Sequence, residues 1–211
     1  MRIVVFGANG STGSEVVRFA KQNSHQVVAA VRRPESVKNV DGIEVAKIDL
    51  NNHASLVNAI EGSDAVVMAI GHGGVMASSK PTTLYSDDVR SVRRAMRQTG
   101  VKRIIVLSSG GTVYDQAAPW FYRALLRPFL INTYLDMARM ETILEESEDL
   151  DWTAVRLTYL LEGDSKPVVA EEGKIGRGNF KIHFVDAGKF VVEELLQRQW
   201  VKGYPVIGYL K

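Results

Sequence analysis

The chain has 211 residues, of which 45% are hydrophobic and 24% are charged, and its formal net charge is +2. These values are ordinary for a globular domain, and the near-neutral charge gives no indication of bulk attraction to nucleic acid or membranes. The absence of cysteine excludes disulfides, thiolate metal sites and cysteine nucleophiles.

Residue 1 leads directly into an apolar, β-type run at residues 3–6. No apolar run in the chain approaches the roughly 18–20 residues that a membrane span needs. We therefore expect a cytoplasmic protein that has neither a signal peptide nor a membrane segment.

Three glycines follow the first strand: Gly7, Gly10 and Gly13. Apolar residues at helical spacing come next, so the order is strand, glycine turn and helix. This order is typical of a dinucleotide-binding βαβ unit, in which the glycines allow a tight turn, close approach of the pyrophosphate and close helix–strand packing; the alternative is a glycine-rich turn of another α/β fold. Hydroxyl groups between the last two glycines can cap the helix and bind phosphate. The predicted cofactor contacts in this turn are Gly7, Asn9, Gly10, Ser11, Thr12 and Gly13.

The second predicted strand ends in Arg32 and Arg33, with no acidic residue at its tip. An acid at this position usually binds the ribose 2′-hydroxyl of NAD, whereas arginine accommodates the 2′-phosphate of NADP. The sequence therefore predicts NADP(H) in preference to NAD(H). After the third strand, the Asp49 carboxylate can bind the exocyclic amine of adenine while Leu50 packs on the ring; alternatively, Asp49 is a helix N-cap or a turn acceptor.

Strand-like and helix-like segments alternate along almost the whole chain. Strands are predicted at residues 3–6, 26–31, 43–47, 65–70, 103–107, 152–156 and 205–208, and helices at 12–22, 54–60, 83–99, 133–146 and 186–198. This alternation predicts an α/β fold, a doubly wound parallel sheet with helices on both faces and strand order 3-2-1-4-5-6. We expect one domain over residues 1–211, with a small substrate-side lobe at about 157–185.

The carboxyl ends of the fourth and fifth strands are the expected ligand edge of such a sheet. Ile70, Gly71 and Ser108 are predicted to contact the cofactor there, and His72 follows them in a loop. The hydroxyl of Ser109 can orient the nicotinamide carboxamide or bind a substrate carbonyl, although strand-end turn chemistry explains it equally well. Tyr114 is a candidate phenolic acid, or else packs at the base of its loop. The aromatic segment 119–130 has three possible interpretations: a substrate lid, a subunit contact or part of the hydrophobic core.

These motifs resemble those of the atypical short-chain dehydrogenase/reductases, an NAD(P)H-binding group that includes biliverdin reductase B/flavin reductase-like and NmrA-like proteins. The matching segments are residues 7–13, 31–33, 49–50, 105–109, 151–156, 176–182 and 185–187. The resemblance implies a Rossmann domain with NADP in its cleft and a reductase or redox-sensing role. Where the family often has Arg-Pro after the sixth strand, this chain has Arg156-Leu157, which alters the expected substrate floor near the nicotinamide.

The usual catalytic pair of short-chain dehydrogenases is Tyr-x-x-x-Lys, and the tyrosines at 114, 122, 134 and 159 all lack a lysine four residues later. This absence argues against ordinary alcohol or ketone dehydrogenation. The leading hypothesis is an NADPH-dependent reductase that transfers hydride to a flat conjugated acceptor, such as a flavin, quinone or tetrapyrrole, and the missing pair supports a non-catalytic sensor equally well. A non-catalytic NADP(H) sensor of the NmrA-like kind is the second hypothesis, and a sugar-nucleotide epimerase-like enzyme is the third.

The expected partner is a small-molecule acceptor, and the protein is expected to be a monomer or a homodimer. The histidines lack metal-ligand spacing, so no metal is predicted. Arg90, Arg93, Arg94 and Arg97 form a helical stripe that could bind nucleic acid. The acids at 87 and 88 favour a solvated face with local ion pairs instead, so we expect no nucleic-acid partner and no membrane partner.

Overall fold

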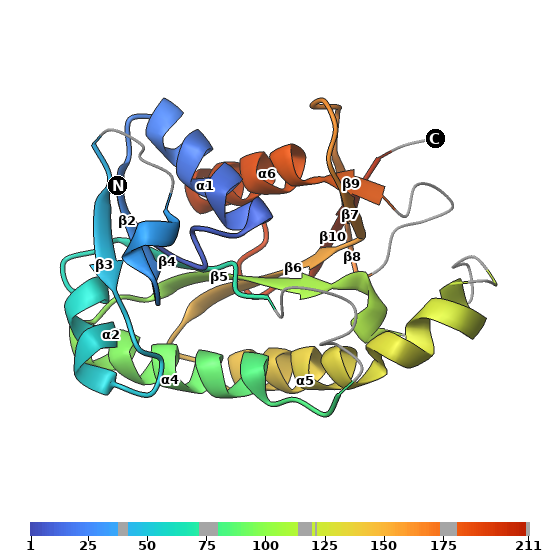
Figure 1. The fold of residues 1–211 in the computed structure, drawn as a ribbon, viewed down its shortest axis with the longest axis horizontal. Helices are drawn as coiled ribbons and strands as arrows, with labels where there is room; N and C mark the ends of the chain where they lie inside the picture. Colours follow the sequence, from blue (N-terminus) through green and yellow to red (C-terminus); the bar gives the residue numbers. More distant parts are fainter. Residues whose placement is uncertain (38–41, 72–79, 114–119, 121, 174–180, 210–211) are drawn as a thin grey trace.

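The computed structural model describes residues 1–37, 42–71, 80–113, 120, 122–173 and 181–209. An eight-stranded sheet runs through the molecule in the order β3-β2-β1-β4-β5-β6-β10-β8 (Figure 1). Every adjacent pair is parallel except β10 and β8, which are antiparallel at one edge. The strands are β1 Arg2–Phe6, β2 Gln26–Val31, β3 Glu44–Lys47, β4 Ala65–Met68, β5 Arg103–Ser109, β6 Asp151–Leu157, β8 Val169–Glu172 and β10 Pro205–Gly208.

The predicted doubly wound sheet and its strand order 3-2-1-4-5-6 are confirmed. The predicted bounds of β2 and β10 match those of the structure, while β5 and β6 are each longer than predicted. β4 ends at Met68 rather than at residue 70. Beyond Met68, the N–H of Ala69 still donates to the carbonyl of Phe6 on β1, but the regular strand pairing stops there. Ile70 therefore lies in the loop at the carboxyl edge.

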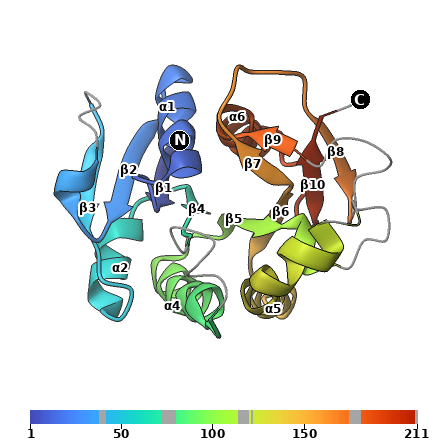
Figure 2. The same cartoon turned by 45° about the vertical axis from the view of Figure 1, so that its right-hand side comes forward.

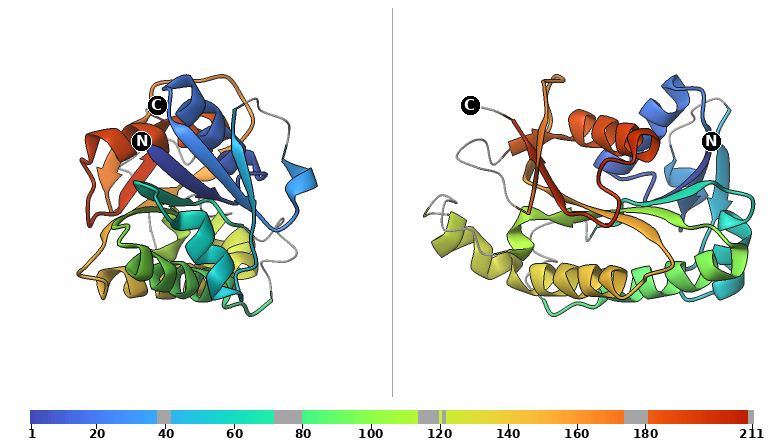
Figure 3. Two further views of the ribbon diagram at one scale, coloured as in Figure 1. Left: turned by 90° about the vertical axis from the view of Figure 1, so that its left-hand side faces the viewer. Right: turned by 180° about the vertical axis from the view of Figure 1, so that it is seen from behind.

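Helices cover both faces of the sheet, with α1 and α6 on one face and α2, α4 and α5 on the other (Figure 2). Their bounds are α1 Ser11–Gln22, α2 His53–Ile60, α4 Leu84–Thr99, α5 Arg127–Glu145 and α6 Phe184–Gln197. The same two layers are seen from the end and from behind in Figure 3. α5 begins six residues before the predicted start at 133, because Pro128 lies in its first turn, where proline is tolerated. A π-helical turn, Tyr122–Leu126, precedes it.

Each strand contributes alternate side chains to two separate cores. Val4 and Phe6 pack in the core beneath α2, α4 and α5, while Ile3 and Val5 pack in the core beneath α1 and α6. Since side chains alternate across a strand, a strand covered on both faces must be apolar throughout. This requirement explains the continuous apolar runs from which the strands were predicted.

Helices α1 and α6 approach each other closely at Gly188. A Cβ atom at this position would lie 2.5 Å from Cβ of Glu15 and 2.8 Å from its carbonyl carbon. Because atoms cannot approach that closely, only glycine allows the two helices this contact. The second half of the chain is thereby packed against the helix that follows the glycine turn.

The range 157–185, where we predict a small lobe, contains elements that the sequence pattern does not indicate. Strands β7 Tyr159–Leu161 and β9 Lys181–His183 pair in parallel as a separate two-stranded sheet, and β8 belongs to the main sheet. Strands of three or four residues are too short to produce a recognisable alternation. The buried carboxylate of Asp186 joins this region to the body, since it accepts hydrogen bonds from Ser165 and from the hydroxyl of Tyr209.

The arginine stripe of α4 packs partly against α5. Arg93 donates to the Ile143 carbonyl and to Ser147, and Arg97 forms a bidentate pair with Asp149 at 2.8 Å. Arg90 pairs with Asp87 at 3.0 Å. These contacts agree with the hypothesis of local ion pairs, except that Asp88 is buried rather than part of a solvated face.

Within the described ranges, no helix is both long enough and apolar enough to cross a membrane. The same residues include no group of three or more His, Cys, Asp or Glu side chains arranged to hold a metal ion.

Candidate functional site

The turn between β1 and α1 can form only with glycine at two of its three glycine positions. Gly7 has φ +76°, and a Cβ there would lie 2.5 Å from the carbonyl oxygen of Ala69. A Cβ at Gly13 would lie 2.1 Å from the carbonyl oxygen of Gly7. At Gly10 the nearest atom would be that same oxygen at 3.3 Å, so packing does not exclude a side chain there. Gly10 lines the pocket at the helix end that is described below.

The N-terminus of α1 is free of a side-chain cap. Gly10 is the N-cap residue, and the helix begins at Ser11, so the predicted capping by the hydroxyls of Ser11 and Thr12 is wrong. Ser11 is exposed, whereas Thr12 is buried. Uncapped N–H groups at the positive end of a helix dipole are a ready site for an anion, and a pyrophosphate fits this arrangement.

A pocket of about 420 Å³ lies beside this helix end. Its walls come from the glycine turn and the first turns of α1, from the segment after β2, from the lobe and from the start of α6. The lining residues are Ala8, Asn9, Gly10, Ser11, Ser14, Glu15, Val17, Ser36, Val37, Glu162, Gly163, Phe184 and Val185. The pocket thus connects the glycine turn with the region where we predict a substrate-side lobe. A ligand that lies along the turn can contact both.

Arg32 and Arg33 follow β2 directly, and both side chains are exposed. A hydrogen bond of 3.0 Å from the Asn9 side chain to Ser36 joins the glycine turn to this segment, and Ser36 in turn donates to the carbonyl of Arg33. The predicted phosphate-binding turn and the predicted 2′-phosphate site are therefore neighbours. The contacts of these residues with a cofactor stay predictions.

Asp49 acts as a turn acceptor, one of the two alternatives to a contact with adenine. Its Oδ1 accepts a hydrogen bond of 2.9 Å from the N–H of Asn51. The N-cap of α2 is Asn52 instead, which accepts from the N–H of Ser55. Leu50 is half-buried against the core beneath α2 and α4, as is Ile70, and Gly71 is exposed beside it.

The two serines at the end of β5 have different environments. Ser108 is buried and donates to Oε1 of Glu141 at 2.7 Å, and Glu141 forms a bidentate pair with Arg156 at 2.8 and 3.0 Å. Burial alone lowers the pKa of Arg156, but the hydrogen bonds and charge of Glu141 outweigh it and raise that pKa, so the pair is ionic. The Ser108 hydroxyl therefore donates its hydrogen to Glu141 within the protein. Its contact with the cofactor stays a prediction.

Ser109 belongs to a chain of three hydroxyl groups. Its oxygen accepts from the N–H of Gly111, and its side chain is a neighbour of the Tyr134 phenol, whose pKa it acts to lower. Tyr122 donates to that phenol at 2.8 Å. Burial and the contact with Tyr122 raise the pKa of Tyr134, so the phenol stays protonated at every physiological pH.

Tyr134 is not predicted as a site residue from the sequence, because no lysine lies four residues after it. The one relevant sequence feature is the glycine at position 111, just after β5. A Cβ atom there would lie 2.3 Å from the Tyr134 ring. This glycine leaves space for an aromatic ring at the end of β5. Tyr114, the predicted phenolic acid, lies outside the described residues, as does His72.

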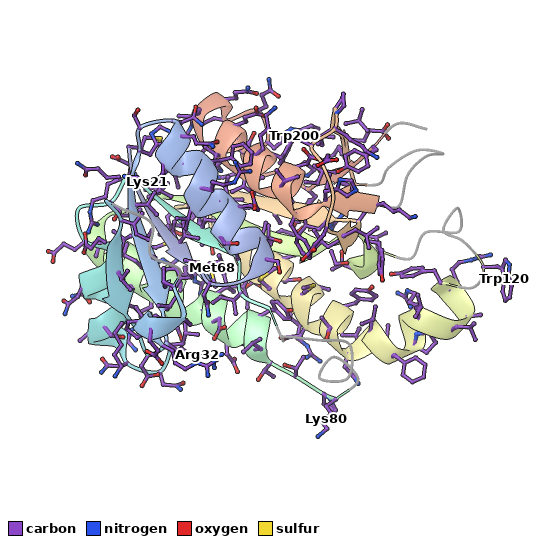
Figure 4. The ribbon with its side chains drawn as sticks, turned by 45° about the horizontal axis from the view of Figure 1, so that its top comes forward. Lys21, Arg32, Met68, Lys80, Trp120 and Trp200 are labelled. Atoms are coloured by element: carbon purple, nitrogen blue, oxygen red, sulfur yellow. The ribbon has the colours of Figure 1, made fainter. Side chains whose placement is uncertain are left out.

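The aromatic segment 119–130 is not plain core. Trp120 is 70% exposed, Leu125 60% and Phe129 59%. Trp120 lies at the extreme end of the molecule in Figure 4, away from the sheet. A lid or a subunit contact therefore remains as the prediction for this segment.

Comparisons with known proteins agree with this geometry. A protein-family model described as NAD(P)H-binding matches residues 7–198. Protein YwnB of Bacillus subtilis (strain 168) is 24% identical over 205 residues, 92% of each chain. An isoflavone reductase homolog of Solanum tuberosum is 26% identical over 197 residues, which are 89% of this chain and 58% of the relative. The fold matches that of a wide-type short-chain dehydrogenase/reductase from Veillonella parvula DSM 2008, solved with NADP, with TM-score 0.80 and 15% identity over 99% of this chain and 94% of that one.

The glycines of the turn provide a test that separates folding from binding. Gly10→Ala is expected to cost about 1 kcal/mol of unfolding free energy or less, while dinucleotide binding weakens at least about tenfold because the methyl group occupies the space of the pyrophosphate. Gly13→Ala is expected to cost about 3 kcal/mol or more, since its Cβ overlaps a backbone oxygen. Urea unfolding and isothermal titration with NADPH measure the two effects. Equal destabilisation by the two variants would contradict the assignment.

Proposed function

Because the chain belongs to the NAD(P)H-binding family, we propose that it is an NADPH-dependent oxidoreductase that passes hydride to a flat conjugated acceptor of the flavin, quinone or tetrapyrrole type. The observation that carries the proposal is the uncapped N-terminus of α1 behind a turn that requires glycine at positions 7 and 13. Two exposed arginines lie at the neighbouring strand tip, where an NAD-selective site has an acid.

The cofactor would be held mainly by backbone groups. The N–H groups of the first turn of α1 would bind the pyrophosphate, and Gly10 would allow it to approach. Arg32 and Arg33 would form charge-assisted bonds to the 2′-phosphate. When bound, the cofactor supplies the hydride, so the remaining tasks of the protein are to orient the acceptor and to deliver a proton.

The proton would come through the hydroxyl chain at the end of β5. Tyr122 is half-buried, Tyr134 is buried, and Ser109 lies at the carboxyl edge, where the nicotinamide of a Rossmann protein is expected. Neutral hydroxyls both donate and accept, so a proton can pass along the chain without any member becoming charged. Because the raised pKa keeps the Tyr134 phenol protonated, Tyr134 would pass on a proton only while it accepts another.

The first experiment is cofactor oxidation by the purified protein with a panel of flavin, quinones and biliverdin, with NADPH and NADH in parallel. We expect turnover with at least one acceptor and a faster rate with NADPH than with NADH. Tight binding of NADPH without turnover would favour the redox sensor, and activity on a sugar nucleotide without net oxidation would favour an epimerase.

The double variant Arg32→Ala/Arg33→Ala tests the cofactor preference. Loss of two charge-assisted contacts is expected to weaken NADPH binding by about 2–3 kcal/mol and to change NADH binding little. Arg90→Ala/Arg94→Ala, which removes two arginines from α4, serves as the control with the same change of charge. Equal losses for NADPH and NADH would disprove the 2′-phosphate assignment.

Tyr134→Phe tests the hydroxyl chain. Removal of the phenol oxygen is expected to lower kcat about 10- to 100-fold and to leave the Kd of NADPH unchanged, because the ring still fills the space beside Gly111. Tyr209→Phe is the control, because it removes another buried phenol, which follows β10 and donates to Asp186 of α6. Unchanged kcat in Tyr134→Phe would mean that the proton comes directly from solvent.

A further inference from the structure

Glu162 is a charged residue of the pocket beside the glycine turn that the function proposed above does not use. Of the described residues that line this pocket, two are acidic, Glu15 and Glu162, and none is lysine or arginine. Glu15 forms an ion pair with Arg18 at 2.6 Å, which compensates its charge. Glu162 is exposed and forms no hydrogen bond or ion pair within the described part of the chain. The pocket therefore has one uncompensated negative charge, which comes from the lobe.

The backbone on both sides of Glu162 is held in place by one histidine. Leu161 pairs with His183 where β7 lies parallel to β9. Gly163 packs against the imidazole of His183, since a Cβ at residue 163 would lie 2.5 Å from Cε1 of that ring. Nδ1 of the same ring donates to the carbonyl of Asp164 at 2.7 Å. A fixed segment of the lobe, rather than a free loop, thus carries Glu162 at the pocket wall.

The topology of the sheet puts Glu162 at the end of the pocket that faces away from the arginines. The pocket extends from Ser36 and Val37, which follow β2, past the glycine turn to the lobe. In Figure 2, the lobe strands β7 and β9 lie on the opposite side of α1 from β2 and β3. A dinucleotide on a Rossmann sheet extends across the point where the strand order reverses, with one half on each side. If the adenosine half lies beside the arginines that follow β2, the nicotinamide half is directed toward Glu162.

The negative charge of Glu162 limits the groups that it can bind. A carboxylate repels phosphate, so the pyrophosphate depends on the N–H groups at the start of α1. The oxidised nicotinamide ring carries one positive charge, whereas the reduced ring is neutral. A carboxylate at this end of the pocket therefore distinguishes the two redox states of the cofactor, although both have the same phosphates and riboses.

We propose that Glu162 strengthens binding of the oxidised cofactor relative to the reduced one and thereby favours hydride transfer to the acceptor. In this step the C4–H bond of the reduced ring breaks, and the hydrogen and its electron pair pass to the acceptor, which is reduced. The ring is left with one positive charge. Attraction between this charge and Glu162 grows as the hydride leaves, and an interaction that grows in this way lowers the barrier. The inference rests on the proposed cofactor site, but not on the preference for NADPH, because the ring charge is the same in NAD⁺ and NADP⁺.

The test measures Kd values for NADP⁺, NADPH, NAD⁺ and NADH by isothermal titration. The ratio of the oxidised to the reduced Kd cancels any repulsion of the phosphates, which both forms share. In Glu162→Gln we expect this ratio to rise about two- to fivefold for each pair, as for a solvent-exposed charge interaction. The rise should shrink in about 1 M salt, which screens such an interaction.

Two further variants serve as controls. Glu162→Asp keeps the charge and is expected to keep the wild-type ratio. Asp164→Asn removes an acid from the same segment, at a residue that does not line the pocket, and is also expected to match wild type. Thermal unfolding checks that each variant is folded.

An unchanged ratio in Glu162→Gln would overturn the inference, and so would an equal rise in Asp164→Asn. Equal weakening of the oxidised and reduced forms would overturn it as well, because Glu162 would then bind groups that both forms share, such as the ribose hydroxyls. These outcomes leave the proposed function intact, since the wild type still binds its cofactor. If the wild type binds none of the four nucleotides, the proposed cofactor site fails, and this inference fails with it.

Discussion

The contact between Gly13 and the carbonyl oxygen of Gly7 is the constraint on which the rest of this molecule depends. Any Cβ at residue 13 would lie 2.1 Å from that oxygen, so only glycine lets α1 begin directly against the end of β1. This close approach directs the uncapped helix end at the carboxyl edge of the sheet. Gly188 allows a similar close approach between α6 and α1. The N-terminal ends of these two helices both line the pocket beside the glycine turn.

On the other face of the sheet, α5 organises the chemistry through three buried polar side chains. Tyr134 accepts from Tyr122 beside Ser109, Asp136 caps α4, and Glu141 pairs with Arg156 and accepts from Ser108. A buried ion pair is costly to form, but once formed it permits only one alignment of its elements. Because Glu141 lies two turns after Tyr134, its pairing fixes the helix that carries the phenol against β5.

The two halves of the site therefore differ in how they are built. The predicted cofactor half uses backbone N–H groups at a helix end, which need no particular side chain except glycine. The predicted proton-delivering half uses hydroxyls whose positions depend on a buried network.

The sequence by itself determined the α/β class, the strand order and the glycine turn, because each depends on local spacing. Continuous apolar runs mark strands covered on both faces, and a glycine triplet between strand and helix has few alternatives. The sequence did not determine the roles of Asp49, Ser11 and Thr12, because short polar side chains can accept hydrogen bonds in turns, cap helices or bind ligands. Only the tertiary structure brought Tyr134 to Ser109 and Glu141 to Arg156. Those pairings join residues far apart in the chain, and their distances follow from how helices pack on the sheet, which no local pattern encodes.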